Sequence, residues 1–362
     1  MLLIVSSHRR KDSINMMKII SRLKSIFIFE ILRYRSKKYI SKKSILIDKD
    51  TLFFVYIPAT DYYYLPYFQL YQFENVFVSF SYINSNELFL KTLRKTKNSS
   101  IYSKYIDVDY DNTKKYVFFF DGKYSWCSNT FREYLKKRYP GCKIIFHLGD
   151  LLSTHKNIHI NEIKRFSDLV VTYDHNDADS NDLIYHSDPY SKLPREMLIN
   201  DKDKCQLLFY GYAKNREEEI LSVYDIMKNN GVKCDFCVPD LSQEGCGVCP
   251  ELANAKFTPY LKYLKKVQNS DCILEIIQRG SRGCTFRTWE AIVYNKRLIT
   301  NNQSVLNEEF YNPQFIQVID SLDSINVDWI KNDVVVDYGY SDRLSPEECF
   351  KFYLDRLNKN IE

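Results

Sequence analysis

Short apolar runs alternate with helical patterns along most of this 362-residue chain, and this alternation is what most constrains its fold. In the first half, runs of strand length fall at residues 2–6, 52–57, 76–80, 116–120, 143–148 and 166–173. Helical patterns lie between some of these runs, at residues 13–34 and 129–138. Strands separated by helices are typical of βαβ units, in which helices cover a parallel sheet. The sequence therefore predicts an α/β fold.

A second series of the same kind follows a break in the pattern. Between residues 186 and 204 the chain is rich in Pro, Ser, Asp and Lys, which favours a linker. Beyond it, strands are predicted at 206–210, 233–238, 272–277 and 297–300, and helices at 215–230, 261–268, 285–294 and 345–357. A chain of this length exceeds the size at which one core usually stops growing. We predict two Rossmann-like domains, residues 1–195 and 196–362, with the last helix packing back on the first.

Basic residues concentrate at the amino-terminal end. Residues 1–43 hold 12 Lys and Arg against Asp12 and Glu30, whereas the whole chain carries a formal charge of only +5. A basic end on an acidic body indicates an anionic partner surface. A membrane is favoured over nucleic acid, because no recognition motif accompanies the charge. The helix at 13–34 is then either an interfacial helix on anionic lipid or a core helix with a solvated basic face.

The start of the chain gives an expectation about location. An apolar run at residues 2–5 precedes the positive cluster at 8–11, the reverse of the order in a signal peptide. No run approaches the roughly 18 apolar residues that span a bilayer. We therefore expect a cytoplasmic protein, peripheral on the inner face of the plasma membrane if the basic end docks there. Its ten cysteines are expected to stay reduced.

Four of the cysteines form two Cys-x2-Cys pairs: Cys234, Cys237, Cys246 and Cys249. Two such pairs suit a tetrahedral zinc site. The first pair, however, falls in a predicted strand, where alternation sends its side chains to opposite faces. Inert thiols are the default interpretation, and we expect no bound metal and no cofactor.

The most informative stretch is a glycine-bearing loop, residues 278–284, that enters the helix predicted from Thr285. Such a loop leaves unpaired N–H groups and the positive end of the helix dipole facing outward, which favours a diphosphate. Gly283 allows close approach, and Arg282 or Arg287 can neutralise the charge. Thr285 can cap the helix or bond a phosphate. Glu290, one turn into the helix, either accepts hydrogen bonds from two ribose hydroxyls or is simply a solvated side chain.

This stretch and three others resemble segments of bacterial lipopolysaccharide and capsule glycosyltransferases of the GT-B fold. The sequence Gly-x-Thr-x-Arg, two residues, Glu-Ala and then Lys-Arg-Leu-Ile-Thr is similar to their donor-binding loop. Residues 208–216 resemble the opening of their second domain, and residues 139–150 and 166–178 resemble first-domain strands that end in Asp. The resemblance implies two domains facing a cleft, with a nucleotide-sugar donor on the second. The implied donor-binding residues are Gly211, Arg216, Arg282, Gly283, Thr285, Arg287 and Glu290.

The implied activity is transfer of a sugar from this donor to a lipid-linked oligosaccharide in bacterial surface polysaccharide synthesis. The alternatives are a polysaccharide pyruvyl-type transferase of the same architecture and a non-catalytic scaffold of the polysaccharide machinery. An inverting transfer needs a base for the acceptor hydroxyl, whereas a retaining transfer depends on stabilising the leaving diphosphate. The candidate bases, all at predicted strand ends, are Asp121, His147 and Asp150, although such residues often only cap helices. Gly149 stands where the family has an aromatic residue, which is a departure from the pattern.

Overall fold

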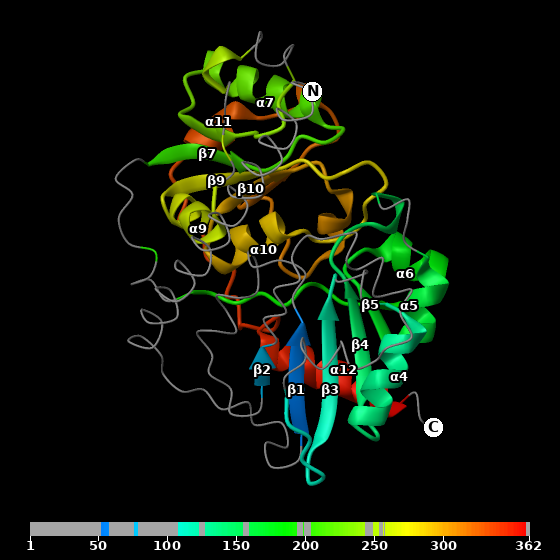
Figure 1. The fold of residues 1–362 in the computed structure, drawn as a ribbon. Coiled ribbons are helices and arrows are strands. Elements are labelled where there is room, and N and C mark those ends of the chain that lie inside the picture. The colour runs from blue at the N-terminus through cyan, green and yellow to red at the C-terminus, as the bar shows by residue number, and fades with distance from the viewer. Residues whose placement is uncertain are drawn as a thin grey trace, which may run out of the picture.

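The computed structural model describes residues 52–57, 76–78, 108–122, 127–154, 159–193, 198, 204–242, 249–252, 256 and 258–359, with the backbone alone for the first two ranges. The strand predicted at 2–6, the helix predicted at 13–34 and the basic end lie outside these residues, as does the domain boundary at 195. The described chain forms two lobes, each built on a parallel sheet (Figure 1).

The first lobe contains a six-stranded sheet in the order β2-β1-β3-β4-β5-β6, with every neighbouring pair parallel. Its strands are β1 (Leu52–Ile57), β2 (Val76–Val78), β3 (Lys115–Asp121), β4 (Lys143–Leu148), β5 (Leu169–Thr172) and β6 (Ile184–Tyr185). Helices α4 (Asn129–Arg138), α5 (Ile160–Phe166) and α6 (His175–Asn181) accompany them, with the 3₁₀ turn η3 (Leu152–Thr154). Phe118 and Phe119 point to opposite faces of β3 and both are buried, as expected where both faces of a parallel sheet are covered.

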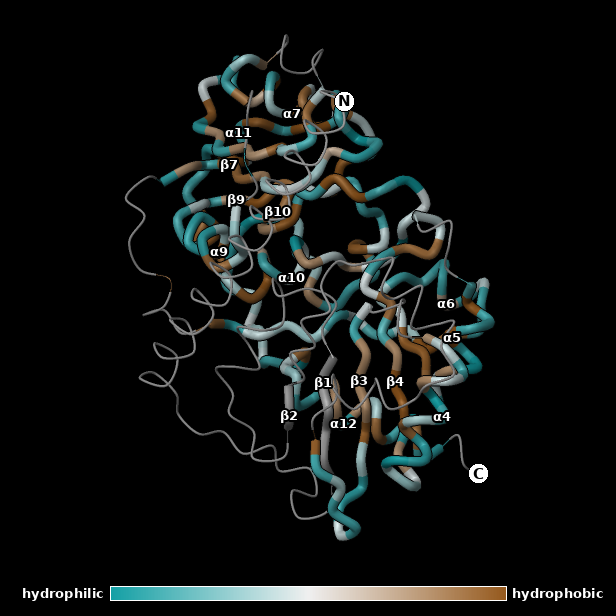
Figure 2. Tube along the Cα trace, viewed as in Figure 1, coloured by the Kyte–Doolittle hydropathy of each residue, from teal (hydrophilic) through white to brown (hydrophobic). Residues whose placement is uncertain are grey.

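The second lobe contains a five-stranded parallel sheet in the order β11-β10-β9-β7-β8. Its strands are β7 (Cys205–Tyr210), β8 (Cys234–Cys237), β9 (Ser270–Glu275), β10 (Arg297–Thr300) and β11 (Ile316–Val318). Its helices are α7 (Glu217–Asn229), α9 (Tyr260–Gln268), α10 (Phe286–Val293), α11 (Val327–Lys331) and α12 (Pro346–Lys359). Three 3₁₀ turns complete it: η5 (Pro250–Leu252), η6 (Gln303–Asn307) and η7 (Leu322–Ser324). Figure 2 shows hydrophobic residues along the strands of both lobes.

Helix α12 returns from the second lobe to the first. The ring of Tyr353 stacks on Phe119 of β3 with centroids 5.5 Å apart, and Phe350 meets the same ring edge-on. In Figure 1 this helix crosses the sheet of the first lobe. The contact shows that α12 covers the face of the sheet on which Phe119 lies, which explains the large apolar side chain at this position.

Of the segment predicted as a polar linker, the described residues 186–193 are largely buried. The amide of His186 donates to the Thr172 carbonyl at 2.9 Å, and that of Tyr190 donates to the Leu344 carbonyl at 2.7 Å. Asp188 and Tyr190 are almost completely buried. The polar side chains among residues 186–191 are therefore interior groups rather than solvent-exposed ones.

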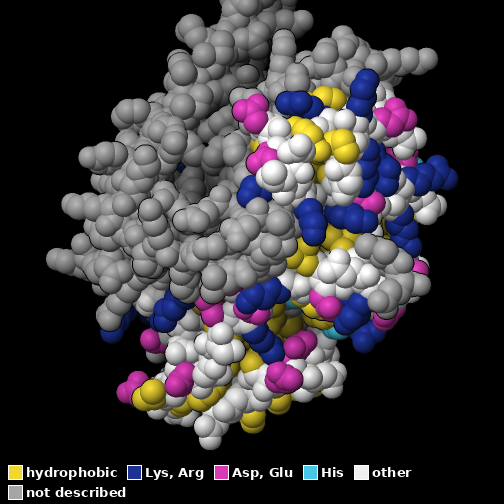
Figure 3. All heavy atoms as spheres, turned by 90° about the horizontal axis from the view of Figure 1, so that it is seen from below, with side chains coloured by type: hydrophobic (Ala, Val, Ile, Leu, Met, Phe, Trp, Pro, Cys, Tyr) yellow, Lys and Arg dark blue, Asp and Glu magenta, His cyan; other side chains and the backbone are white. Residues whose placement is uncertain are grey.

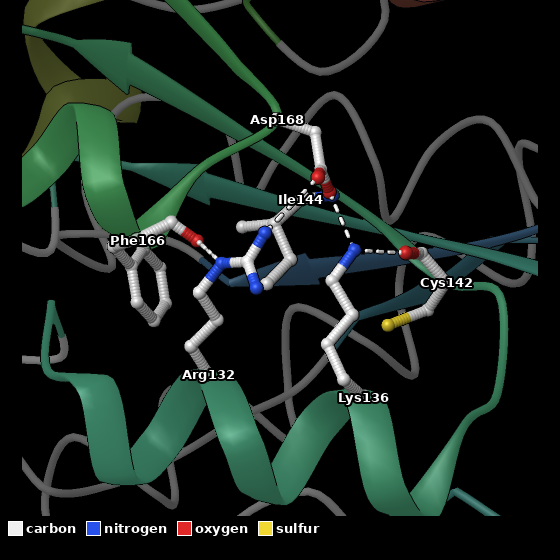
Figure 4. Close-up of polar contacts among 6 residues, drawn as sticks. All are labelled: Arg132, Lys136, Cys142, Ile144, Phe166 and Asp168. Carbon is white, nitrogen blue, oxygen red and sulfur yellow. Dashed lines mark hydrogen bonds and ion pairs between the residues drawn. The ribbon is translucent and has the colours of Figure 1, made fainter.

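Asp168 ties α4 to the sheet of the first lobe (Figure 4). One carboxylate oxygen accepts from Arg132 at 3.3 Å, and the other accepts from Lys136 and the Ile144 amide, each at 2.7 Å. Arg132 also donates to the Phe166 carbonyl at 3.1 Å, and Lys136 to that of Cys142. The network therefore fixes the starts of β4 and β5 against one helix.

Replacing Asp168 with Ala is expected to lower the free energy of unfolding by about 2–3 kcal/mol, because hydrogen bonds to a charged group are lost and Ile144 loses its acceptor. Urea denaturation would measure this loss. Asp355 is a suitable control, since its pair with Lys359 is more than half exposed and its removal should cost less than about 0.5 kcal/mol. Equal losses for the two variants would contradict the structural role of Asp168.

The described surface carries charges of both signs. Seen from below in Figure 3, Lys and Arg side chains are interspersed with Asp and Glu on the described part of that face. Among the described residues, no helix combines the length and apolar character needed to cross a membrane.

Candidate functional site

The carboxyl ends of the two sheets face one another. After β5, the Tyr173 carbonyl lies so close to Gly283 that a Cβ there would be 2.0 Å from its oxygen. After β4, Asp150 pairs with Lys214 of the loop after β7 at 3.7 Å. We call the loops after β4, β5, β7 and β9 the interdomain junction. Open α/β sheets bind ligands at this edge, which makes the junction the candidate site.

Helix α10 begins at the junction with Thr285 as its N-cap, which is one of the two roles predicted for this residue. The Thr285 hydroxyl accepts from the Arg287 amide at 3.2 Å and donates to Glu275 at 2.5 Å. Glu275, fully buried at the end of β9, also accepts from Thr288 at 2.7 Å and Thr300 at 2.6 Å. Three hydroxyls thus hold the end of β9, the start of α10 and the end of β10 together. Sequence reasoning missed Glu275, because its partners lie 10 to 25 positions away.

Arg287 lies across the loop after β7. Its guanidinium is 4.9 Å from the centre of the Phe209 ring and donates to the Tyr210 carbonyl at 2.5 Å. A Cβ on Gly211 would be 2.0 Å from Nη2 of Arg287, so the missing side chain of Gly211 makes room for this arginine. The Nε atom of Arg287 is buried without a hydrogen-bond partner. Within the described residues, Arg287 has no carboxylate at ion-pair distance.

Unpaired amides accompany this charge. The N–H groups of Gly283 and Cys284, immediately before α10, have no acceptor among the residues that the structure describes. Both residues are buried, and buried N–H groups without partners are rare in proteins. Together with Arg287, they give the start of α10 the chemistry of an anion site.

The other two arginines have different roles. Arg216 is buried and donates to the carbonyls of Ala213 at 3.2 Å, Tyr212 at 2.7 Å and Ile276. Burial and the neighbouring Arg287 lower its pKa to about 10. Arg216 therefore braces the loop after β7 against the end of β9. The side chain of Arg282 is exposed, and its guanidinium lies 3.4 Å from the Asn176 side-chain oxygen.

Glu290 is buried, so the interpretation as a solvated side chain is wrong. Its carboxylate accepts from Tyr260 at 3.2 Å and from Tyr263, both on α9. Burial raises the pKa of Glu290 to about 7, against the opposing effects of these hydroxyls and of Arg287. The burial arises because α9 covers this face of α10, a packing that the sequence of α10 alone does not indicate.

The first-lobe candidates separate into a buried pair and a partly exposed residue. His147 is fully buried, with Nδ1 3.4 Å from Asp121 and Nε2 3.0 Å from Asp188 in an ion pair outside hydrogen-bond geometry. Burial alone would lower the pKa of His147, but the two carboxylates outweigh it and raise the pKa to about 9. An imidazolium already carries its proton, and without exposed surface it cannot take one from the hydroxyl of a sugar acceptor. The prediction of His147 as a candidate base is therefore wrong, and His147 acts as a structural cation. Asp121 is its buried partner, whereas Asp150 is about 42% exposed.

The cysteine pairs are described in part, because Cys246 lies outside the described residues. Cys234 is partly buried and packs against the core of the second lobe, whereas Cys237 donates to the Lys256 carbonyl at 3.3 Å. Burial raises the pKa of both thiols, to about 12 for Cys234, which disfavours the thiolates that zinc needs. Within the described part of the chain, no group of three or more His, Cys, Asp or Glu is placed to hold a metal ion.

Comparisons with known proteins agree with this architecture. No protein-family profile and no curated sequence matches the chain. Among solved structures, it is similar to an α-glucosyltransferase in complex with UDP-glucose and DNA containing an abasic site, with 12% identity, a TM-score of 0.53, and 85% of this chain and 99% of that chain covered. An α-glucosyltransferase with UDP and a 13-mer DNA matches with 13% identity, a TM-score of 0.52 and the same coverage. A glycosyltransferase from Rickettsia africae matches with 11% identity and a TM-score of 0.45, over 86% of this chain and 99% of that chain. At these identities the first two matches establish the fold: the chain consists of two Rossmann-like domains in the GT-B arrangement.

Proposed function

We propose that this chain is a glycosyltransferase that uses a nucleotide-sugar donor, whose diphosphate binds at the start of α10. The observation that carries the proposal is the positive charge of Arg287 without a carboxylate partner in the described chain, next to the unpaired N–H groups of Gly283 and Cys284. A diphosphate supplies the negative charge and the acceptor oxygens that these groups lack.

In the proposed reaction, the junction stabilises the leaving group. Negative charge develops on the diphosphate as its bond to the sugar breaks, and Arg287 with the two amides would stabilise that charge without reorganising. On the opposite side of the junction, Asp150 is the partly exposed carboxylate among the predicted bases and would face the acceptor. Glu290 in this proposal supports α10 from behind through Tyr260 and Tyr263.

The acceptor part of the proposal depends on the sequence resemblance. A lipid-linked oligosaccharide of a bacterial surface polysaccharide is the acceptor that the resemblance implies. The basic residues 1–43 would hold the enzyme near such a substrate on the cytoplasmic face of an anionic membrane.

Wild-type protein is expected to bind UDP, GDP or CDP, and replacing Arg287 with Gln should weaken that binding by roughly tenfold to a hundredfold, since a charge-assisted contact is lost. Calorimetry with each nucleoside diphosphate measures the affinity, and a thermal-shift series over nucleotide-sugars then identifies the donor, because a ligand of the folded state raises its melting temperature. A urea denaturation curve of the variant would show whether the lost contact to the Tyr210 carbonyl changes stability as well.

Arg279 offers a matched control for this substitution. It is an exposed arginine on the loop that leads into α10 and is paired with Glu219 at 3.3 Å, so Arg279→Gln should leave the affinity unchanged. Absence of binding to all three nucleoside diphosphates at millimolar concentration would contradict the proposed function. Stabilisation by phosphoenolpyruvate instead would point to the pyruvyl-type alternative.

A further inference from the structure

Asp174 stands at the meeting point of the two lobes. It follows β5, is fully buried, and acts as the N-cap of α6. One carboxylate oxygen, Oδ1, accepts from the Asp177 amide at 3.1 Å, which is the ordinary capping bond. The other oxygen, Oδ2, is not needed for the cap.

That second oxygen contacts the loop before α10 in the second lobe. It accepts from the Arg282 amide at 2.5 Å and from the Ser281 hydroxyl at 3.0 Å. Two further hydrogen bonds join the same segments: the His175 amide donates to the Arg282 carbonyl at 2.9 Å, and the Asn176 side chain donates to the Gly280 carbonyl at 2.8 Å. We call these four hydrogen bonds the interdomain latch.

The latch fixes the orientation of the Gly283 N–H group, which the proposed donor site needs. The Arg282 carbonyl belongs to the same peptide plane as the Gly283 N–H, and in a trans peptide the two point in opposite directions. Holding this carbonyl against His175 therefore directs the Gly283 N–H away from the first lobe's α6. Asp174 in turn holds the preceding amide, so the turn that leads into α10 is set from outside its own lobe.

We propose that Asp174 is a positioning residue, which latches the two lobes together and thereby presets the Gly283 N–H for the diphosphate of the donor. This inference rests on the proposed function. The opposite role, a carboxylate that occupies the place of a phosphate, fits less well, since Asp174 contacts Arg282 and Ser281 while leaving the Gly283 and Cys284 amides open.

Asp174→Asn separates the latch from the cap. Asn caps helices about as well as Asp, so the bond to Asp177 can persist. Its amide group, however, replaces an acceptor oxygen with a donor, which would face the Arg282 N–H. UDP affinity is expected to fall roughly tenfold to a hundredfold, as for the loss of a charge-assisted contact. Affinity for uridine, which has no phosphate, should stay within about twofold of the wild-type value, and a loss caused only by misfolding would lower both.

Asp177→Asn is the matched control. Asp177 lies on the same helix and accepts from the Leu152 amide at 2.9 Å, within the first lobe. Its variant should retain wild-type UDP affinity. The inference is overturned if Asp174→Asn binds UDP as Asp177→Asn does, or if it binds UDP more tightly, as expected for a competing carboxylate.

A second measurement tests the latch without a ligand. Small-angle X-ray scattering of the full chain should show a larger radius of gyration for Asp174→Asn than for Asp177→Asn, since the lobes can separate. Equal values would overturn the latch. If wild-type protein binds none of UDP, GDP, CDP and inorganic pyrophosphate, the proposed function fails, whereas the scattering result still decides whether Asp174 joins the lobes.

Discussion

Replacing His147 with Gln is expected to lower the free energy of unfolding by about 3–5 kcal/mol, because removing one partner from a buried ion pair leaves uncompensated charge. His147 is fully buried between Asp121 of β3 and Asp188 of the linker. Burial raises the pKa of Cys349 and of Tyr353 on α12, and the nearby Asp188 raises both further. The loss would therefore weaken the place where sheet, linker and last helix meet.

The pH dependence of stability distinguishes this interpretation from a simple packing defect. The pKa of His147 is about 9 in the folded protein against an ordinary value of 6.5, so its stabilising contribution is complete below about pH 6.5 and is lost as the pH rises through 9. Glu290 also has a raised pKa, and its contribution is lost as the pH rises from about 4.5 through 7. Both effects reduce stability toward high pH. Glu290 is present in wild type and variant alike, so its effect cancels in the difference between their free energies of unfolding.

The difference in unfolding free energy between wild type and His147→Gln should consequently shrink between pH 6.5 and 9.5. Urea denaturation at several pH values measures it. Asp188→Asn provides the second arm of a double-mutant cycle, in which the two losses should not add, because they break one ion pair. A difference that stays constant over this pH range would show that His147 is not held as an imidazolium.

Replacing Gly283 with Ala is expected to cost about 3 kcal/mol of unfolding free energy and to abolish detectable binding of UDP. The new Cβ would lie 2.0 Å from the Tyr173 carbonyl oxygen and 3.1 Å from the Asp174 Cα, both backbone atoms. Backbone cannot move aside as a flexible side chain can, so the two lobes would have to separate at the junction. Urea denaturation and calorimetry measure the two effects.

Gly149→Ala is the control for this substitution. Gly149 follows β4 on the first-lobe side of the junction, and a Cβ there would be 3.7 Å from an oxygen of Asp121, an ordinary contact. We expect little change in stability or binding. If Gly283→Ala behaves like Gly149→Ala, the close approach of the lobes at Tyr173 is not present in solution.

The sequence by itself determined several of the described elements and their order, although it did not predict α5, β11 or α11. Helix Asn129–Arg138 and strands Lys143–Leu148 and Arg297–Thr300 have the predicted bounds, since caps, glycines and apolar periodicity act over a few residues. It also gave the cap of α10 as one of two roles for Thr285, and the structure shows the cap. The boundary between α5 and β5 was not predicted. The run 166–173, predicted as one strand, contains the end of α5 and all of β5, because an apolar run shows no boundary between a buried helix end and a buried strand.

Only the tertiary structure decided what the polar side chains do. The pairing of His147 with Asp188, the three hydroxyls on Glu275, the two tyrosines on Glu290 and the reach of Asp174 to Arg282 all join residues distant in the chain. A side chain's protonation and its free hydrogen-bonding groups depend on burial and on charges within a few ångströms. Those neighbours are set by how the two sheets and α12 pack together, so a local pattern can place a carboxylate at a strand end without revealing whether it binds a ligand, a cation or the other lobe.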